Sequence, residues 1–385
     1  MRILMMITYY RPHTSGLTIY VERLVKALAM RGHEVTVLTS QFERSLLKEE
    51  HKDGVHIVRA PVLFRLSKGV IMPTIGQLAT RLVKESDVVH LHLPQFDAAG
   101  VALRGRLFHK PTVITYHCDL QLPFGILSWL ANQGVHVMNH LAAWFTDRIV
   151  TYTQDYADHS PYLSHYKSKL AVILPPVELP PITIEEKTSF TMRHNPAGHH
   201  PVIGMAARFA AEKGVEVLLE ALPTVLAKYP EALVLYAGQF QNVIGEETYL
   251  NKLSPQIDRY ISQGHWKFLG NLVPEQIASF YPNLDVFLVP SLNSTESFGL
   301  VQVEAMMNGV PVVASNLPGV RQPVKLTGMG EIAIVGDSND LARAILAVLD
   351  NPARYRGNPG EVARRFSPDA NAVAYEKVYE ELLDR

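Results

Sequence analysis

The segment VFLVPSLNSTESFGLVQVEAMMNGVPVVA, residues 286–314, indicates the fold of this chain. It opens with a short, continuous apolar run, which is typical of a strand buried on both faces, and Pro290 ends that run. From Phe298 onward apolar residues recur at helical spacing, until Gly309 stops the helix and a second apolar run follows. The segment therefore predicts a strand–helix–strand unit of a parallel sheet, with a right-handed crossover.

The start of the predicted helix is a candidate anion site. Its first amides, those of Phe298, Gly299 and Leu300, have no acceptor within the helix and carry the positive end of the helix dipole. Glu296 precedes the helix and Glu304 lies within it, so two carboxylates flank the anion. Carboxylates only accept hydrogen bonds, so they can bind neutral sugar hydroxyls without repelling them. The pattern predicts a site for a phosphate-linked sugar, and the alternative is one capping and one solvated glutamate.

Two similar openings divide the chain. Apolar runs at residues 3–7 and 202–205 are each followed by a loop, an amphipathic helix and another apolar run, which predicts two parallel sheets. Prolines and a polar run between the halves predict a linker. The expected division is a first Rossmann-like domain over 1–180, a linker over 181–200, a second Rossmann-like domain over 201–365 and a terminal helix over 366–385.

Composition restricts the class of protein. The 385 residues exceed the usual span of one hydrophobic core, and the net charge of -1 gives no basic excess to attract nucleic acid. The single cysteine, Cys118, excludes an internal disulfide and any multi-cysteine metal site. The apolar segment at the start of the sequence, residues 1–7, is too short for a signal peptide. No apolar run reaches the roughly 20 residues of a membrane span. We therefore expect a soluble, cytoplasmic enzyme of two domains.

Two motifs carry a resemblance to a known family. Residues 296–304, ESFGLVQVE, match the pattern E-x-F-G-x-x-x-x-E without a gap, and residues 208–214, RFAAEKG, match a second signature. The chain resembles family 4 of the retaining glycosyltransferases, the glycosyl transferases group 1, over nearly its whole length. The resemblance implies the α/β GT-B fold, in which two Rossmann-like domains with parallel sheets face each other across a cleft. It also implies a C-terminal helix that crosses back to the N-terminal domain.

The resemblance implies a reaction and a role for each motif. A hexosyl unit would pass from a nucleotide diphosphate sugar to an acceptor hydroxyl, with the anomeric configuration retained. Glu296 would touch the donor sugar, Glu304 the ribose, and the amides of residues 298–300 the sugar or diphosphate. Arg208 and Lys213 follow a predicted strand, and as donor-only cations they would neutralise the leaving diphosphate. Taken alone, the pair would be weak evidence, because surface arginines and lysines are usually solvated.

Further candidate residues lie at other strand and helix ends. Gly16, where this chain has Ser15-Gly16 in place of the family's glycine pair, is expected to give a second anion contact. His117 is expected to hydrogen-bond a sugar hydroxyl, and a packed core histidine is the alternative. Asp119 is expected to orient or deprotonate the acceptor. Gly270, at a predicted strand end, is expected near the nucleotide base.

The sequence predicts no metal site and no cofactor besides the donor. His90 and His92 share a strand face, but no carboxylate or cysteine stands at ligand spacing, and no D-x-D motif lies in a suitable loop. On family frequency a UDP-sugar is the favoured donor, with GDP-mannose as the alternative. A GT-B nucleotide-sugar epimerase and a non-catalytic GT-B scaffold are the rival hypotheses.

Two segments bear on the acceptor. Residues 64–72 mix basic and apolar side chains, and residues 122–145 are apolar with almost no charge. Both could rest on a membrane surface and reach a lipid-linked sugar, although ordinary buried helices would explain them equally well. We expect a sugar or lipid-linked sugar acceptor, peripheral contact with the inner face of the membrane, and a role in cell-envelope glycolipid or polysaccharide assembly.

Overall fold

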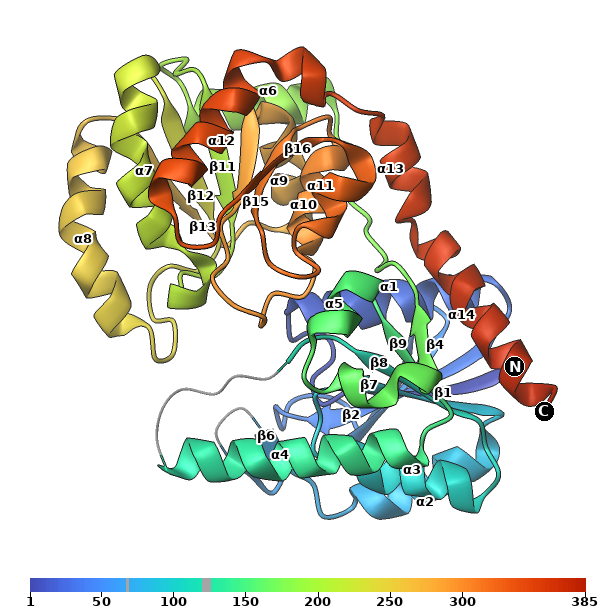
Figure 1. Ribbon diagram of the computed structural model, residues 1–385. Helices are drawn as coiled ribbons and strands as arrows, with labels where there is room; N and C mark the ends of the chain where they lie inside the picture. Colours follow the sequence, from blue (N-terminus) through green and yellow to red (C-terminus); the bar gives the residue numbers. More distant parts are fainter. Residues whose placement is uncertain (67–68, 120–125) are drawn as a thin grey trace. The chain divides into compact units, whose positions relative to one another are not determined.

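The computed structural model describes residues 1–66, 69–119 and 126–385. The chain forms two compact units, one of residues 1–176 together with 366–385 and one of residues 177–365. Each unit is an α/β layer structure around a mainly parallel sheet (Figure 1). The predicted class, α/β with two parallel-sheet domains, is confirmed.

The sheet of the first unit has the strand order β10-β9-β8-β7-β1-β2-β4-β3. All neighbours in it are parallel except β3, which is antiparallel to β4. Its strands are β1 (Arg2–Met6), β2 (Glu34–Gln41), β3 (Glu49–Lys52), β4 (Val55–Pro61), β7 (Val88–Leu93), β8 (Thr112–Tyr116), β9 (Arg148–Thr151) and β10 (Leu170–Val172). Two further strands, β5 (Phe64–Leu66) and β6 (Gly69–Ile71), form a separate antiparallel pair.

Helices cover this sheet, and the last of them comes from the far end of the chain. The helices are α1 (Gly16–Met30), α2 (Ile75–Glu85), α3 (Ala98–Leu107), α4 (Ile126–Phe145), α5 (Gln154–His159), the 3-10 helix η1 (Leu163–Lys169) and α14 (Pro368–Leu383). Helix α14 packs on α1, and the hydroxyls of Tyr20 and Tyr375 lie 2.7 Å apart in the buried contact. The terminal helix is thus part of the first unit.

The sheet of the second unit has the order β13-β12-β11-β14-β15-β16 and is parallel throughout. Its strands are β11 (Val202–Ala206), β12 (Leu233–Ala237), β13 (Trp266–Gly270), β14 (Val286–Val289), β15 (Val312–Ser315) and β16 (Gly330–Ala333). Its helices are α6 (Ile184–His194), η2 (Ala211–Lys213), α7 (Val215–Lys228), α8 (Glu247–Ser262), α9 (Pro274–Phe280), η3 (Tyr281–Asn283), α10 (Leu300–Met307), α11 (Gln322–Thr327), α12 (Ser338–Asp350), η4 (Pro352–Tyr355) and α13 (Pro359–Arg365).

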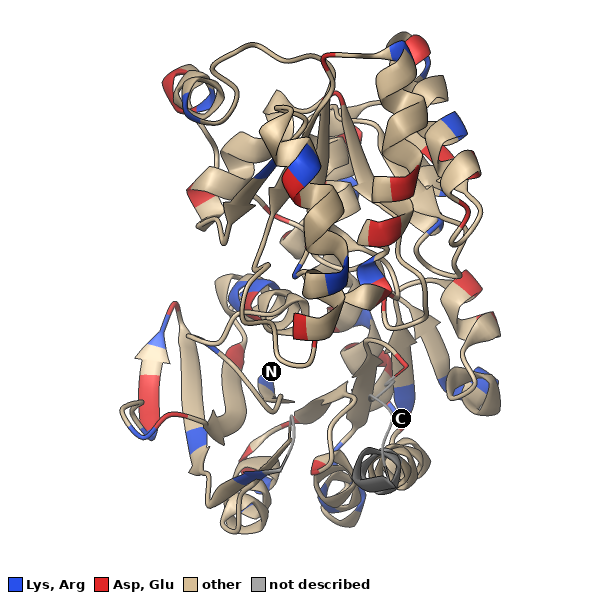
Figure 2. Ribbon diagram, turned by 90° about the vertical axis from the view of Figure 1, so that its left-hand side faces the viewer, with Lys and Arg blue, Asp and Glu red and all other residues tan. Residues whose placement is uncertain are grey.

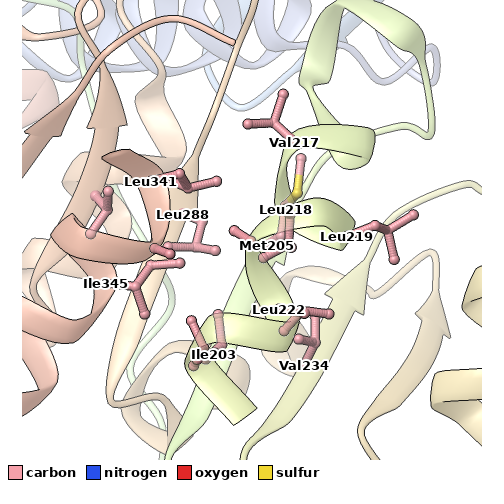
Figure 3. Packing of buried hydrophobic residues seen from close by; sticks show 14 of the residues in the cluster. Ile203, Met205, Val217, Leu218, Leu219, Leu222, Val234, Leu288, Leu341 and Ile345 are labelled. Carbon is pink, nitrogen blue, oxygen red and sulfur yellow. The ribbon is translucent and has the colours of Figure 1, made fainter. Parts of the chain in front are cut away.

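The core of the second unit lies between its sheet and helices α7 and α12. Figure 3 shows Leu218 and Leu222 of α7 and Leu341 and Ile345 of α12 directed toward the strand residues. Each of these four side chains is at most 2% exposed. Every residue of β12 and β14 is buried, so both faces of these strands are covered, which explains their continuous apolar runs.

The structure corrects two expectations. Residues 181–200 were expected to form a linker, but they contain α6, and the units divide at Pro176 and Val177. Thr183 and Glu186 form a capping box at the start of α6, and its Phe190 is buried against Phe280. A helix with polar capping residues and a single buried aromatic side chain has a mostly polar sequence, so its segment resembled a linker. Helix α10 begins at Leu300, two residues after its predicted start.

Charged residues are spread over both units. Lys and Arg segments alternate with Asp and Glu segments on the helices, and neither sign dominates the face seen in Figure 2. This distribution agrees with the net charge of -1. In the described part of the chain no helix is both long and apolar enough to cross a membrane.

Candidate functional site

In the second unit, two loops meet beyond the sheet. Residues 208–214 follow β11 and residues 290–299 follow β14, and these parallel strands are neighbours, so their carboxyl ends share an edge. The Leu292 N–H donates a hydrogen bond to the Glu212 carbonyl at 2.9 Å. Gly214 has a φ of +70°, and a Cβ at this position would stand 2.1 Å from the Pro290 carbonyl oxygen. Only glycine permits this approach of the two backbones.

The approach brings Lys213 and Glu296 together. Lys213 Nζ lies 2.7 Å from Glu296 Oε2, and the two side chains are 19% and 22% exposed. Asn293 shapes the loop that carries Glu296, because its Oδ1 accepts hydrogen bonds from the Thr295 amide and hydroxyl. The ion pair is preformed and partly open to solvent, so the cation and the carboxylate are both accessible to a ligand.

Arg208 lies on the same loop as Lys213 but has another partner. Its guanidinium forms an ion pair with the Glu212 carboxylate, and its side chain is 45% exposed. The structure therefore places both predicted cations on one short loop, each paired with a glutamate. An anion bound there would have to compete with those carboxylates.

Helix α10 begins at a left-handed residue. Gly299 has a φ of +76°, and a Cβ there would stand 2.6 Å from Gln302 Nε2. Gln302 is fully buried and donates to the carbonyls of Phe298 and Val320, at 2.9 and 3.0 Å. The glycine is thus required by the backbone turn, and the first helical amide is that of Leu300 rather than Phe298. Gln302 was missed, although a glutamine on an otherwise apolar helix is a signal that could have found it.

Glu304 is held by a residue that the sequence analysis missed. Its carboxylate is 8% exposed and accepts a hydrogen bond of 2.7 Å from the Tyr281 hydroxyl. Tyr281 lies in η3 and is fully buried. Nothing local in the sequence connects the two residues, since they are 23 positions apart and belong to different elements.

The two glycines outside these loops differ in backbone conformation. Gly270 ends β13 with a φ of +70°, and its carbonyl accepts a hydrogen bond of 2.8 Å from the Gly238 amide. Gly16 is the first residue of α1, after Ser15, whose side chain caps the Thr18 amide. A Cβ would meet nothing within 4 Å at either position. Gly16 belongs to the first unit and Gly270 to the second.

His117, in the first unit, is buried. Its side chain is 6% exposed, its Nε2 lies 3.0 Å from His92 Nδ1, and its Nδ1 is hydrogen-bonded to the Tyr152 hydroxyl. Burial lowers the pKa of His117 to about 3, so the ring is neutral. Both ring nitrogens have protein partners, which favours the packed-histidine alternative over contact with a sugar.

Asp119 is also engaged by its neighbours. Its carboxylate accepts hydrogen bonds from the hydroxyls of Tyr116, Tyr156 and Ser160, at 2.9, 2.9 and 2.8 Å. Its own amide donates to the Tyr156 hydroxyl at 2.7 Å. This arrangement closes the turn after β8 and uses the carboxylate as a structural acceptor.

Comparisons with known proteins cover the same two halves. The sequence model described as Glycosyl transferases group 1 matches residues 187–366, and that described as Glycosyltransferase Family 4 matches residues 14–179. The chain belongs to glycosyltransferase family 4. The two matches meet close to the observed division between the units, so each model describes one unit of this glycosyltransferase.

Relatives and solved structures extend over the whole glycosyltransferase. A phosphatidyl-myo-inositol mannosyltransferase of Mycobacterium leprae is 27% identical over 99% of this chain and 96% of its own length. A glycogen synthase of Mycobacterium tuberculosis is 26% identical over 98% of this chain and 94% of its own length. Anabaena HepE in complex with UDP superposes with a TM-score of 0.78 at 19% identity, over 99% of this chain and 100% of that one. Sucrose-phosphate synthase from Thermosynechococcus elongatus superposes with a TM-score of 0.75 at 20% identity, over 100% of this chain and 99% of that one. These neighbours confirm the GT-B fold.

Two further candidate functional residues of the glycosyltransferase lie shortly after β7. Gln95 is 3% exposed, and neither atom of its amide has a hydrogen-bond partner in the part of the chain that the structure describes. Burial raises the pKa of the nearby Asp97 to about 6. Two polar residues, Gln95 and Asp97, shortly after a buried strand were a signal for both. Within the described residues, no group of three or more His, Cys, Asp or Glu side chains is arranged to hold a metal.

Proposed function

We propose that this glycosyltransferase moves a hexosyl unit from a nucleotide diphosphate sugar to an acceptor hydroxyl, with retention of the anomeric configuration. The observation that supports the proposal most directly is the contact of 2.7 Å between Lys213 Nζ and Glu296 Oε2. A diphosphate can replace the carboxylate as the partner of Lys213, because it carries more negative charge. Glu296 is then released to accept hydrogen bonds from the donor sugar.

The same loops would stabilise the leaving group. As the bond between the anomeric carbon and the phosphate oxygen breaks, the electron pair stays with the diphosphate. Lys213, Arg208 and the first amides of α10 would face that charge, and preorganised donors of this kind usually supply a large part of the catalytic effect. Glu304 would bind the ribose and Gly270 would border the base. In this proposal the reaction needs no metal ion and no cofactor.

Retention would follow from attack on the face that the phosphate leaves. The acceptor oxygen forms the new bond to the anomeric carbon, and its proton passes to the departing phosphate oxygen. No side chain then has to act as the base, which fits an Asp119 carboxylate that is already occupied by three hydroxyls. We therefore assign His117 and Asp119 to the packing of the first unit.

The comparisons guide the choice of substrates. A UDP-sugar is the favoured donor, since solved structures of Anabaena HepE hold UDP and UDP-glucose. GDP-mannose is the alternative, since curated relatives are mannosyltransferases. A phosphatidyl-myo-inositol mannosyltransferase among the relatives supports a sugar or lipid-linked sugar acceptor, and hence a cytoplasmic role in envelope glycolipid or polysaccharide assembly.

A surface of α3 and α4 would suit contact with the inner face of the membrane. Leu107 and Trp144 are each 63% exposed and Val137 is 55% exposed. The two helices pack on each other and contain no Asp or Glu, while α3 carries Arg104 and Arg106. An exposed apolar surface without carboxylates favours anionic lipid. Residues 67–68 and 122–125 of the segments predicted to touch the membrane lie outside the described residues.

Ligand-induced thermal shifts with UDP-, GDP-, ADP- and dTDP-sugars would identify the donor. The preferred donor should raise the melting temperature of the wild-type protein, since a ligand that binds only the folded state stabilises it. Lys213→Ala should lose most of that shift, while Lys228→Ala, which breaks the exposed Lys228–Asp350 pair of the same unit, should retain it. Equal shifts in both variants would contradict the proposal. Conversion of the donor sugar without acceptor would instead support the epimerase.

A further inference from the structure

A cavity of the second unit lies outside the loops assigned to the donor. It encloses about 410 Å³ between helix α8 and the edge strand β13, and its lining includes three aromatic residues, Phe240, Trp266 and Phe268. This volume is within the range of small-molecule sites. Neither the catalytic loops nor the first unit contributes to the lining, so the proposed donor site leaves the cavity unexplained.

The aromatic residues form an ordered wall. The rings of Phe240 and Phe268 are stacked with their centroids 4.1 Å apart and an angle of 5° between their planes. Trp266 meets Phe268 edge to face at 5.7 Å. Both phenylalanines are half-buried. Flat aromatic surfaces with an electron-rich face attract the C–H groups of a sugar ring, because those groups carry partial positive charge.

Polar groups without partners lie around this wall. The side chains of Gln241 and Asp258 are exposed and have no hydrogen-bond or ion-pair partner among residues 1–66, 69–119 and 126–385. Trp266 is 2% exposed, and its buried Nε1 likewise lacks an acceptor in that part of the chain. A buried N–H needs an acceptor, while an amide and a carboxylate can bind hydroxyls. The exposed amide of Gln241 and carboxylate of Asp258 therefore offer a donor and acceptors suited to a polyol.

The charges of the lining favour a neutral ligand. Lys267 borders the cavity, but its ammonium donates to the carbonyls of Arg193 and His194 at the end of α6, both at 3.1 Å. The ammonium keeps its positive charge, so the described lining carries no net formal charge, and the Asp258 carboxylate is the charged group without a protein partner there. It would repel a phosphate or another carboxylate. A nucleotide is therefore disfavoured, and a neutral carbohydrate matches both the aromatic wall and the polar rim.

We propose that the cavity between α8 and β13 is a binding site for a neutral oligosaccharide, separate from the donor site. This assignment comes from the lining alone and would hold even if the proposed transfer reaction were wrong. In a glycosyltransferase such a site would retain a saccharide chain near the enzyme between transfers.

The test is isothermal titration calorimetry on the full chain in the absence of nucleotide. Maltotetraose, cellotetraose and mannotetraose are titrated in separate experiments. We expect saturable binding of at least one, with a Kd up to about 10 mM. Phe240→Ala should weaken it by about tenfold or more and Asp258→Ala by about threefold or more. Ile244→Ala is the matched control, because Ile244 is 90% exposed on the loop that carries Phe240 and lies outside the lining, and it should change nothing.

Three results would overturn the proposal. They are no saturable binding of any of the three sugars, binding that both Phe240→Ala and Asp258→Ala leave intact, and binding that is abolished by Lys213→Ala. The last would place the saccharide at the donor loops. Since Asp258 is exposed on a helix, its replacement keeps the test valid even if Phe240→Ala fails to fold. Failure of donor binding in the thermal-shift experiment would leave this result unaffected.

Discussion

Two strand-end regions of this glycosyltransferase, one in each unit, differ in how their polar residues are used. In the second unit Lys213 and Glu296 pair with each other and stay about one-fifth exposed. In the first unit His117 and Asp119 follow β8, yet each is hydrogen-bonded to two or more side chains of its own unit. A position at a strand end thus indicates where a site can form, and the neighbours decide whether the residue is available.

The physical reason lies in the strands beside β8. His90 and His92 share one face of β7, which runs parallel to β8, so their rings meet Thr115 and His117. Helix α14 closes this cluster, and the Tyr379 hydroxyl lies 2.7 Å from His90 Nδ1. The first unit has therefore built a buried polar core where the second unit has an open ion pair.

The largest predicted difference between the two regions is in acid. Burial lowers the pKa of His90 and His117 from 6.5 to about 3, so the folded chain keeps both rings neutral while the unfolded chain protonates them below 6.5. Stability present above pH 6.5 is then lost as the pH falls toward 3, on the order of 3 kcal/mol for each histidine by pH 4.

Urea unfolding at pH 7, 5 and 4, with pepsin cleavage sites mapped at pH 4, would measure this loss. Cleavage should begin within residues 1–176. Earlier cleavage within residues 177–365 would contradict the prediction that the first unit is the more sensitive to acid. Replacing His90 by glutamine should reduce the pH dependence by about half, because the neutral amide does not titrate while His117 still does.

Glu296→Ala should leave stability nearly unchanged and remove activity. A partly exposed ion pair contributes about 0–1 kcal/mol to folding. Under the proposed role of Glu296 in binding the reacting sugar, its loss should lower kcat/KM by about 100-fold or more, equivalent to roughly 3 kcal/mol. Steady-state transfer from the preferred donor would test this, with Asp350→Ala, from the Lys228–Asp350 pair, as the control. A loss of less than tenfold would move the sugar contact elsewhere.

Gly214→Ala and Gly16→Ala should have opposite effects on unfolding. At Gly214 a methyl group meets the Pro290 carbonyl at 2.1 Å and φ is +70°, so we expect a loss of about 2–3 kcal/mol. At Gly16 the space is open and the residue is helical, so alanine should stabilise by about 0.5 kcal/mol. Chemical denaturation of both variants would check this, and equal effects would show that the loops of the second unit are not held by the glycine.

Asp97→Asn should give a small effect on stability, expressed mainly at neutral and alkaline pH. Burial raises the pKa of Asp97 from 3.8 to about 6, so the fold disfavours the charged carboxylate. Above pH 6 the asparagine variant should be more stable than the wild type, by on the order of 1 kcal/mol after allowance for partial exposure. Most of this gain should be lost near pH 4, where the carboxyl is protonated in the folded chain and about half protonated in the unfolded chain. Melting temperatures at pH 8 and pH 4 would measure it, and a gain that persists in full at pH 4 would contradict the assigned cause.

Local pattern accounted for much of the fold. The apolar run at 286–289 coincides with β14, and the predicted strand over 202–205 lies within β11. The predicted start of α10 was wrong by two residues, because Gly299 adopts a left-handed turn that Gln302 stabilises from within the helix. The prediction of a linker over 181–200 was wrong because one buried phenylalanine is enough to hold α6 in place. A single apolar residue produces no helical periodicity in the sequence.

The sequence by itself determined the alternation of strands and helices, the two-unit plan and the motifs that place this chain in glycosyltransferase family 4. Those features depend on residues a few positions apart, whose spacing sets the local backbone and the buried face. Only the tertiary structure decided that Lys213 meets Glu296, that Tyr281 holds Glu304 and that Tyr379 meets His90, across 83, 23 and 289 positions. Packing chooses such partners, because side chains distant in sequence share a neighbourhood only after the sheets and helices have assembled.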